Sequence, residues 1–280
     1  MVIQYLDGVE IKLKASFDLN FINDYGKVFR VFERGGGNLC FGVEKAGRRY
    51  FLKFAGADLA NADDWVTPEN TIERLKKSVP IYKDLKHPLL ANMIDAFEIG
   101  GGFMTVFDWF DGESFGYPQP EMCKKFMALP AEEKNRVFEG IMEFHAYVAE
   151  CGYVALDFND QAPLYDFDTG DFVICDIDSY VKQPCINLVG DMGGDPALMS
   201  PEEETTGATV DEISNVYAMG GMAFIFFAQD DKYSPEKWEL SDELYKVAKK
   251  AISESRDERH QSIQNLIVEW QTAYRNKHKE

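Results

Sequence analysis

Two aspartates follow short apolar runs in the middle of the chain. The runs are residues 153–156 and 172–175, and they end in Asp157 and Asp176. Short apolar runs bounded by polar residues are typical of buried strands, so each carboxylate is expected at the mouth of a strand. Two such carboxylates side by side suit magnesium and phosphate chemistry, because they offer hard oxygen ligands and a base for a hydroxyl group. The alternative is a hairpin whose turn is acidic because turns favour Asp and Asn.

A glycine run and a lysine precede these aspartates. The three successive glycines Gly35, Gly36 and Gly37 let backbone amides approach an anion closely, although glycine-rich turns are also common in ordinary hairpins. Lys53 lies within the apolar run 50–54. If it is buried there, its charge needs an anionic partner, whereas on an edge strand it would be an ordinary surface lysine.

Turn and cap signals outline the elements around these residues. Asp7-Gly8 between two alternating runs predicts a hairpin, and Thr67 before Pro68 predicts the start of a helix. His145 lies on the apolar face of a predicted helix and is interpreted as a core histidine rather than a ligand. The predicted strands of the N-terminal part are residues 2–6, 9–13, 28–32, 39–43, 50–54, 96–100 and 102–107.

The composition limits the function. The chain has 280 residues, of which 45% are hydrophobic, so it can bury a large core as one large or two modest domains. Its net charge of -19 disfavours non-specific binding to nucleic acid or to anionic membranes. Five cysteines without a C-x-x-C pair, and no leader of basic and then apolar residues, indicate reduced thiols in a cytoplasmic protein. No apolar run approaches the length of a membrane span.

The segment around the two aspartates resembles the catalytic core of the protein-kinase-like superfamily, which includes the aminoglycoside phosphotransferases. Ala155-Leu156-Asp157 stands where that family has His-Arg-Asp, and Asp176-Ile177-Asp178 stands where it has Asp-Phe-Gly. Ser200-Pro201-Glu202 matches the family's Ala-Pro-Glu, and Arg259 lies where an arginine pairs with that glutamate. Asn215, at the start of a predicted long helix, replaces an aspartate of the family.

The resemblance implies an α+β fold of two lobes. Residues 1–110 would form an antiparallel-sheet N-lobe with the hairpin, the glycine-rich loop, the strand lysine and one helix. Residues 111–280 would form a mostly helical C-lobe. Lys53 would hold the α- and β-phosphates of ATP, with Glu73 of the predicted helix as its partner, and the glycines 35 to 37 would cover those phosphates.

The same resemblance assigns further roles. Phe107 would be the gatekeeper, and the Asp108 C=O and the Phe110 N–H would contact adenine. Asp157 would orient the acceptor hydroxyl and take its proton, and Asp176 would bind Mg²⁺. The usual metal-binding asparagine is replaced by an alanine, Ala162. Asn159, Asp160 and Gln161 of the same loop carry oxygen ligands, and Asp160 is the best substitute because its oxygen is anionic. Asp160 or Asp178 would help Asp176 to bind the ion.

The function implied is transfer of the ATP γ-phosphate, with Mg²⁺, to a hydroxyl group of a protein Ser or Thr or of a small molecule. An acceptor with positive charge would suit the acidic chain, although solubility explains the charge equally well. Leu156 replaces the basic residue that would clamp a phosphorylated loop, so regulation by loop phosphorylation is not expected. The alternative is a nucleotide-binding pseudokinase that acts as an interaction module, and the sequence does not identify the acceptor.

Overall fold

The computed structural model describes residues 1–33, 36–63, 66–116, 119–229, 231–232 and 234–277, and it divides into two compact units. The first unit comprises Met1–Lys86 and Ala91–Asp111, and the second comprises His87–Leu90 and Gly112–Glu280. The protein has the expected α+β composition, with antiparallel sheets and separate helices. The sequence placed a boundary after residue 110, whereas the observed division follows Asp111 and assigns His87–Leu90 to the second unit.

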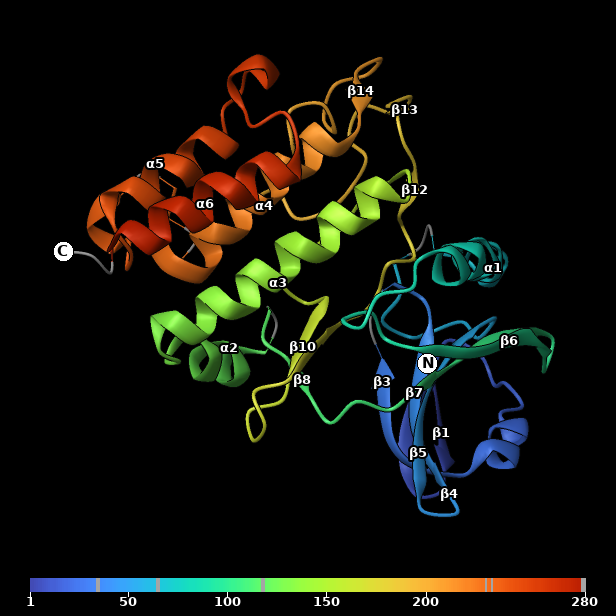
Figure 1. Ribbon diagram of the computed structural model, residues 1–280. Helices are drawn as coiled ribbons and strands as arrows, with labels where there is room; N and C mark the ends of the chain where they lie inside the picture. Colours follow the sequence, from blue (N-terminus) through green and yellow to red (C-terminus); the bar gives the residue numbers. More distant parts are fainter. Residues whose placement is uncertain (34–35, 64–65, 117–118, 230, 233, 278–280) are drawn as a thin grey trace. The chain divides into compact units, whose positions relative to one another are not determined.

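The first unit is built on a five-stranded antiparallel sheet with the strand order β3-β4-β5-β7-β6 (Figure 1). The strands are β3 (Lys27–Glu33), β4 (Leu39–Lys45), β5 (Arg48–Ala55), β6 (Met93–Ile99) and β7 (Gly102–Asp108). Successive residues of a strand point to opposite faces. Different elements pack on the two faces of this sheet.

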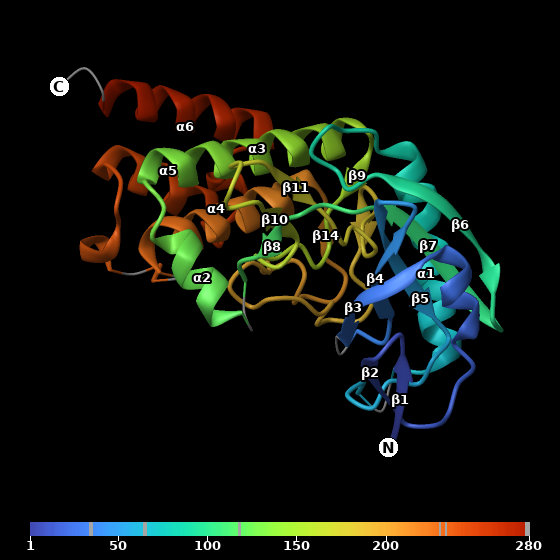
Figure 2. The same ribbon diagram turned by 90° about the horizontal axis from the view of Figure 1, so that it is seen from below.

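The N-terminal hairpin covers one face (Figure 2). Its strands β1 (Val2–Leu6) and β2 (Val9–Leu13) pair around Asp7 and Gly8, whose φ angles of 52° and 84° suit a two-residue turn. The hairpin predicted from the sequence is therefore confirmed. The hairpin, the short helix η1 (Asn20–Tyr25) and the sheet share one apolar core, which includes Leu6, Ile11, Leu13, Ile22, Phe41, Leu52, Phe54 and Met104.

Helix α1 (Pro68–Asp84) packs on the other face of the sheet. It begins as predicted, with Thr67 as the N-cap and a proline in the first turn. Leu75 of the helix packs with Ala55 of β5 and Phe103 of β7. Residues of β5 and β7 that point to the hairpin core therefore alternate with residues that point towards α1.

The second unit is mostly helical (Figure 1). Its helices are α2 (Pro120–Met127), α3 (Ala131–Glu150), α4 (Glu212–Ala228), α5 (Asp242–Ala251) and α6 (Ile263–Lys277), with the short turns η2 (Pro235–Lys237) and η3 (Arg256–Glu258). The rings of Phe138, Phe227 and Trp270 contact one another and join α3, α4 and α6. Among the described residues, no helix has the length and apolar character needed to cross a membrane.

Short strands lie between these helices, and the predicted aspartates lie in the loops that follow two of them. They are β8 (Glu113–Ser114), β9 (Tyr153–Val154), β10 (Pro163–Tyr165), β11 (Phe172–Ile174), β12 (Val181–Lys182), β13 (Cys185–Ile186) and β14 (Thr209–Val210). β9 pairs with β12, whereas β11 pairs with β10. The two apolar runs are therefore strands, as predicted, but they do not form a hairpin with each other, which contradicts the acidic-turn alternative.

Candidate functional site

Asp157 and Asp176 lie at the same end of a two-stranded ladder in the second unit. Asp157 follows β9 and Asp176 precedes β12, and these strands pair antiparallel. The antiparallel pairing brings the end of one strand beside the start of the other. Both aspartates are exposed, whereas the adjacent Phe158 and Ile177 are buried. The core therefore holds both loops and leaves the two carboxylates exposed.

The backbone of these two residues is unusual. Five non-glycine residues of the described chain have a left-handed φ. Asp7 and Ala46 lie in hairpin turns and Gln229 is the C-cap of α4, where this conformation is common. The other two are Asp157 and Asp176, with φ of 56° and 58°. Such a residue costs roughly 1 to 3 kcal/mol, persists only where its surroundings hold it, and is typical of functional sites.

The buried ring of Tyr180 lies close to both aspartates. Burial raises the pKa of the Tyr180 phenol well above its usual range, and the electrostatic effects of Asp176, Cys175 and Asp157 raise it further. The Tyr180 hydroxyl is 2.8 Å from Nε2 of His145, which is fully buried, as expected of a core histidine. The charges of both carboxylates therefore act on the single side chain of Tyr180.

Asn215 of α4 anchors the segment that precedes Asp157. Its Oδ1 accepts a hydrogen bond from the Ala155 N–H at 2.8 Å, and its Nδ2 donates to the Ala155 C=O at 2.7 Å. A carboxylate could accept the first bond but could not donate the second. The asparagine that departs from the family pattern thus holds both backbone groups of one residue, and it is buried.

Ala162 lies beside the segment that leads to Asp176. The Cys175 N–H donates to the Ala162 C=O at 2.9 Å. The position at which the family has its metal-binding asparagine is therefore next to the predicted metal ligand in this chain. Ala162 is buried, and its methyl group offers no oxygen to a cation.

Asp160, the candidate substitute, packs against Gly116. An ideal Cβ on Gly116 would come within 2.3 Å of Asp160 Oδ1, so only a glycine leaves room for this carboxylate. Burial, and then the charge of Asp160, raises the pKa of the Cys123 thiol in α2. The Asp160 carboxylate is therefore close to both Gly116 and the Cys123 thiol. Asp178, the other candidate, is half-buried and follows Ile177.

The predicted metal ligands Asp176, Asp160 and Asp178 all lie among the described residues. Nowhere in the described ranges do three His, Cys, Asp or Glu side chains converge on a possible metal position. Mg²⁺ in nucleotide sites is usually held by one or two carboxylates, with phosphate and water oxygens as its other ligands. Asp176 is exposed and can supply such an oxygen.

Lys53 lies on the α1 face of the sheet in the first unit. It is paired with Thr105 across β5 and β7, and its neighbours Leu52 and Phe54 point into the hairpin core on the opposite face. The residue is half-buried. The alternation of the strand therefore directs Lys53 away from the apolar core formed by its two neighbours.

Glu73, the expected partner of Lys53, forms a different ion pair. Its carboxylate lies 2.6 Å from Nζ of Lys77, one helical turn further along α1, and its side chain is 65% exposed. The hydrogen bond and the charge of Lys77 lower the pKa of Glu73. The expected pairing is corrected accordingly, because α1 turns Leu75 towards the sheet and leaves Glu73 on its exposed side.

The glycine-rich loop contacts α1. Gly35 lies outside the described residues. The Gly36 C=O accepts a hydrogen bond from Arg74 of α1, a residue that the sequence did not indicate. Gly37 has φ of 83°, and an ideal Cβ on it would lie 2.3 Å from Cγ1 of Val66. Gly37 is therefore needed for close packing of the loop, independently of any phosphate.

The predicted adenine contacts lie at the end of β7. Phe107 is buried, and its ring lies edge-on to that of Tyr82 of α1, with centroids 5.0 Å apart. The Asp108 carboxylate accepts a hydrogen bond from Nδ2 of Asn92 at 2.6 Å. Within the described part of the chain, the Phe110 N–H donates to no backbone carbonyl.

A buried ion pair predicted from the sequence is confirmed in the second unit. Nη1 and Nη2 of Arg259 lie 2.7 and 3.0 Å from the two carboxylate oxygens of Glu202. Arg256, which the sequence did not indicate, also donates to Glu202 and binds Asp211 through two bonds of 2.8 and 2.9 Å. Burial raises the pKa of Glu202, but the hydrogen bonds and charge of Arg259 outweigh burial and bring it below its ordinary value.

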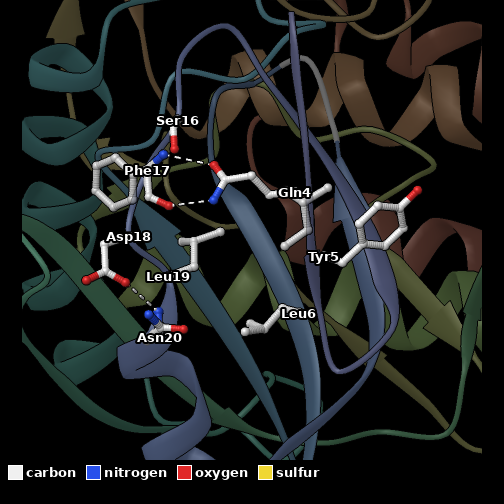
Figure 3. A pocket seen from close by; sticks show the side chains of 9 residues that line it. Gln4, Tyr5, Leu6, Ser16, Phe17, Asp18, Leu19 and Asn20 are labelled. Carbon is white, nitrogen blue, oxygen red and sulfur yellow. Dashed lines mark hydrogen bonds between the residues drawn. The ribbon is translucent and has the colours of Figure 1, made fainter.

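A hollow of about 200 Å³ lies beside the N-terminal hairpin (Figure 3). The Gln4 amide spans part of it by bonding the Phe17 N–H at 2.8 Å and the Phe17 C=O at 2.9 Å. None of the predicted site residues lines this hollow. A smaller hollow adjoins Asp157 and is lined in part by Gly194 and Asp195.

Comparison of the sequence with protein-family models gives no match, and comparison with curated proteins gives none either. The function must therefore be inferred from the residues of each unit.

Proposed function

We propose that this protein is an ATP-dependent phosphotransferase with the two-lobed fold of the protein-kinase-like superfamily. The N-lobe would correspond to the first unit and the C-lobe to the second. The pair of Asp157 and Asp176 carries the proposal. Both are exposed, both have a left-handed backbone, both lie at one end of the β9 and β12 ladder, and both act on the buried phenol of Tyr180.

Each aspartate has a chemical role in this proposal. Asp157 orients the acceptor hydroxyl, which belongs to a protein Ser or Thr or to a small molecule, and accepts its proton. Asp176 holds Mg²⁺, with Asp178 or Asp160 as a further carboxylate. Bound Mg²⁺ supplies positive charge to the phosphate oxygens. The exposure of both carboxylates and the burial of their neighbours support a role for both at an accessible site.

The first unit would bind the nucleotide. Lys53 holds the α- and β-phosphates, and the amides of the glycine-rich loop cover them. The adenine ring packs beside Phe107 and bonds the Asp108 C=O and the Phe110 N–H. The direction of Lys53 away from the apolar core below the N-terminal hairpin supports this assignment.

A nucleotide-binding pseudokinase is the second candidate, and Ala162 favours it. Its methyl group is buried next to Cys175, at the position of the family's second metal ligand. Without that ligand, the protein would still bind nucleotide but would transfer phosphate slowly. The protein would then act as an interaction module.

Thermal unfolding with millimolar MgATP tests the nucleotide site. A ligand that binds only the folded state adds about 2.7 kcal/mol of stability at a hundredfold excess over Kd. The melting temperature of the parent should rise with MgATP, and that of Lys53→Ala should not. Lys27→Ala is the matched control, because Lys27 is an exposed lysine in β3 of the same sheet. A parent protein that shows no rise at several millimolar MgATP refutes the nucleotide site.

Asp157→Asn separates the enzyme from the pseudokinase. Asparagine tolerates the left-handed backbone and keeps the volume, so the fold should be retained. Transfer, or ATP hydrolysis without an acceptor, should fall by about 10²- to 10⁴-fold, while ATP affinity changes little. Asp168→Asn, in the exposed turn between β10 and β11, should leave turnover unchanged. Equally slow hydrolysis by the parent and Asp157→Asn favours the interaction module.

A further inference from the structure

His145 of α3 is hydrogen-bonded through both ring nitrogens. Its Nδ1 lies 2.8 Å from the Ile141 C=O, and its Nε2 lies 2.8 Å from the Tyr180 hydroxyl. A carbonyl can only accept, so Nδ1 carries the proton and Nε2 accepts the hydroxyl hydrogen of Tyr180. The ring is fully buried and neutral, because burial lowers its pKa to about 4.

The same ring contacts the loop of the other aspartate. The ring centroids of His145 and Phe158 are 4.2 Å apart, with the rings inclined at 61°. Phe158 directly follows Asp157, and Tyr180 belongs to the segment that contains Asp176. His145 therefore touches both loops, one through a ring contact and the other through a hydrogen bond.

The loops need such a support. Both aspartates have a left-handed backbone, which persists only where the surrounding structure fixes it. Ala155 and Leu156, which precede Asp157, have no polar side-chain group that could hold the loops together. The anchors must come from other elements, and His145 lies on the long helix α3, which is fixed in the core of the second unit.

We propose that His145 and Tyr180 are positioning residues that hold the Asp157 and Asp176 loops in register with each other. The Tyr180 hydroxyl fixes the segment after Asp176 to α3, and the same imidazole supports the loop after Asp157 through Phe158. This inference rests on the proposed phosphotransferase function for its effect on turnover. Its structural part, the coupling of the two loops, is open to a separate measurement.

Tyr180→Phe removes only the hydroxyl group. A misplaced reacting group typically costs up to about 100-fold in rate, so kcat for ATP hydrolysis should fall by about 10- to 100-fold while KM for ATP stays within a few-fold. Tyr165→Phe is the matched control, because Tyr165 is also buried in the second unit and donates its hydroxyl hydrogen to Glu133 at 2.6 Å. It should lower the melting temperature without lowering kcat.

A double variant separates positioning from stability. Tyr180→Phe leaves the imidazole acceptor of His145 buried without its donor, which lowers the melting temperature. Adding His145→Leu removes that acceptor and should restore much of the melting temperature. The kcat of the double variant should stay low, because the two loops are still not held together. Recovery of kcat along with stability would overturn the inference.

Amide hydrogen exchange provides a readout that needs no turnover. Tyr180→Phe should speed exchange in residues 176–181 and also in residues 157–160, and Tyr165→Phe should change neither segment. Faster exchange confined to residues 176–181 would show that the loops are not coupled. A parent protein without ATP hydrolysis would refute the proposed function, while exchange would still decide whether His145 and Tyr180 join the loops.

Discussion

Mild acid should destabilise this protein through His145. Its ring is fully buried, and a proton on Nε2 would both bury a charge and break the bond that the Tyr180 hydroxyl donates. Burial lowers the pKa of His145 from 6.5 to about 4, and the hydrogen bond to the Ile141 carbonyl opposes that shift only in part.

The direction of the change in stability with pH follows from proton binding. Between pH 6.5 and pH 4 the unfolded chain binds a proton at His145 and the folded protein does not, so the free energy of unfolding falls as the pH falls. The loss of stability begins near the pKa of His145 in the unfolded chain and is complete near its pKa in the folded protein. The difference between the two pKa values corresponds to about 3 kcal/mol in full and about 2 kcal/mol at pH 5. That is a large part of the stability of a typical domain.

Urea unfolding of the parent and of His145→Gln at pH 7.5 and pH 5 measures this contribution. Glutamine does not titrate, and its amide can still donate to the Ile141 carbonyl and accept from Tyr180. The many Asp and Glu residues are common to both proteins, so their effects cancel in the comparison. The parent should lose about 2 kcal/mol more than the variant between the two pH values. Equal losses in the free energy of unfolding would show that burial of His145 does not disfavour its protonation.

Two further predictions concern packing and charge. Gly37→Ala should destabilise the protein by about 1 to 3 kcal/mol more than Gly8→Ala, because both glycines have positive φ but, of the two, only Gly37 lacks room for a Cβ. Chemical denaturation measures the difference, and equal losses of stability would contradict the close packing of the loop. Arg259→Met should cost about 3 kcal/mol, because it removes a partner of the buried carboxylate of Glu202. Lys250→Met, which breaks an exposed pair, should cost less than about 1 kcal/mol in the same assay.

Features set by adjacent residues were predictable from the sequence. The Asp7-Gly8 turn, the Thr67 cap and the strands around Lys53 depend on local backbone preferences and short periodicities, and all of them occur where expected. The Glu202 and Arg259 pair is distant in sequence, and it was predicted only through the resemblance to a known family.

Features set by the rotation of a helix were not predictable. Successive residues of a helix are about 100° apart, so the buried face of α1 decides which neighbour meets the glycine-rich loop. Arg74 bonds the Gly36 carbonyl, whereas Glu73 faces solvent and pairs with Lys77. The spacing of apolar residues in this helix is interrupted by Pro80, and so the sequence alone could not fix that rotation.

The pairing of the short strands could not be predicted from the sequence either. The runs that end in Asp157 and Asp176 looked alike, yet one pairs with β12 and the other with β10. Strands of two or three residues carry too few side chains to specify a partner, so their pairing is decided by the helices that they join. The same holds for Tyr180 and His145, which meet only because α3 and the β12 segment are packed together.

The departures from the family pattern are of two physical kinds. Asn215 replaces an aspartate, but its amide both accepts from and donates to Ala155, so the loop of Asp157 is held by two bonds that one carboxylate could not make. Ala162 replaces an asparagine with a methyl group, which removes an oxygen and supplies nothing in exchange. Asn215 therefore positions the loop of Asp157, whereas Ala162 offers no oxygen to a metal. Under the proposed function, the dependence of ATP binding and turnover on Mg²⁺ is therefore the property that Ala162 should affect most, and turnover that requires unusually high Mg²⁺ is the expected result.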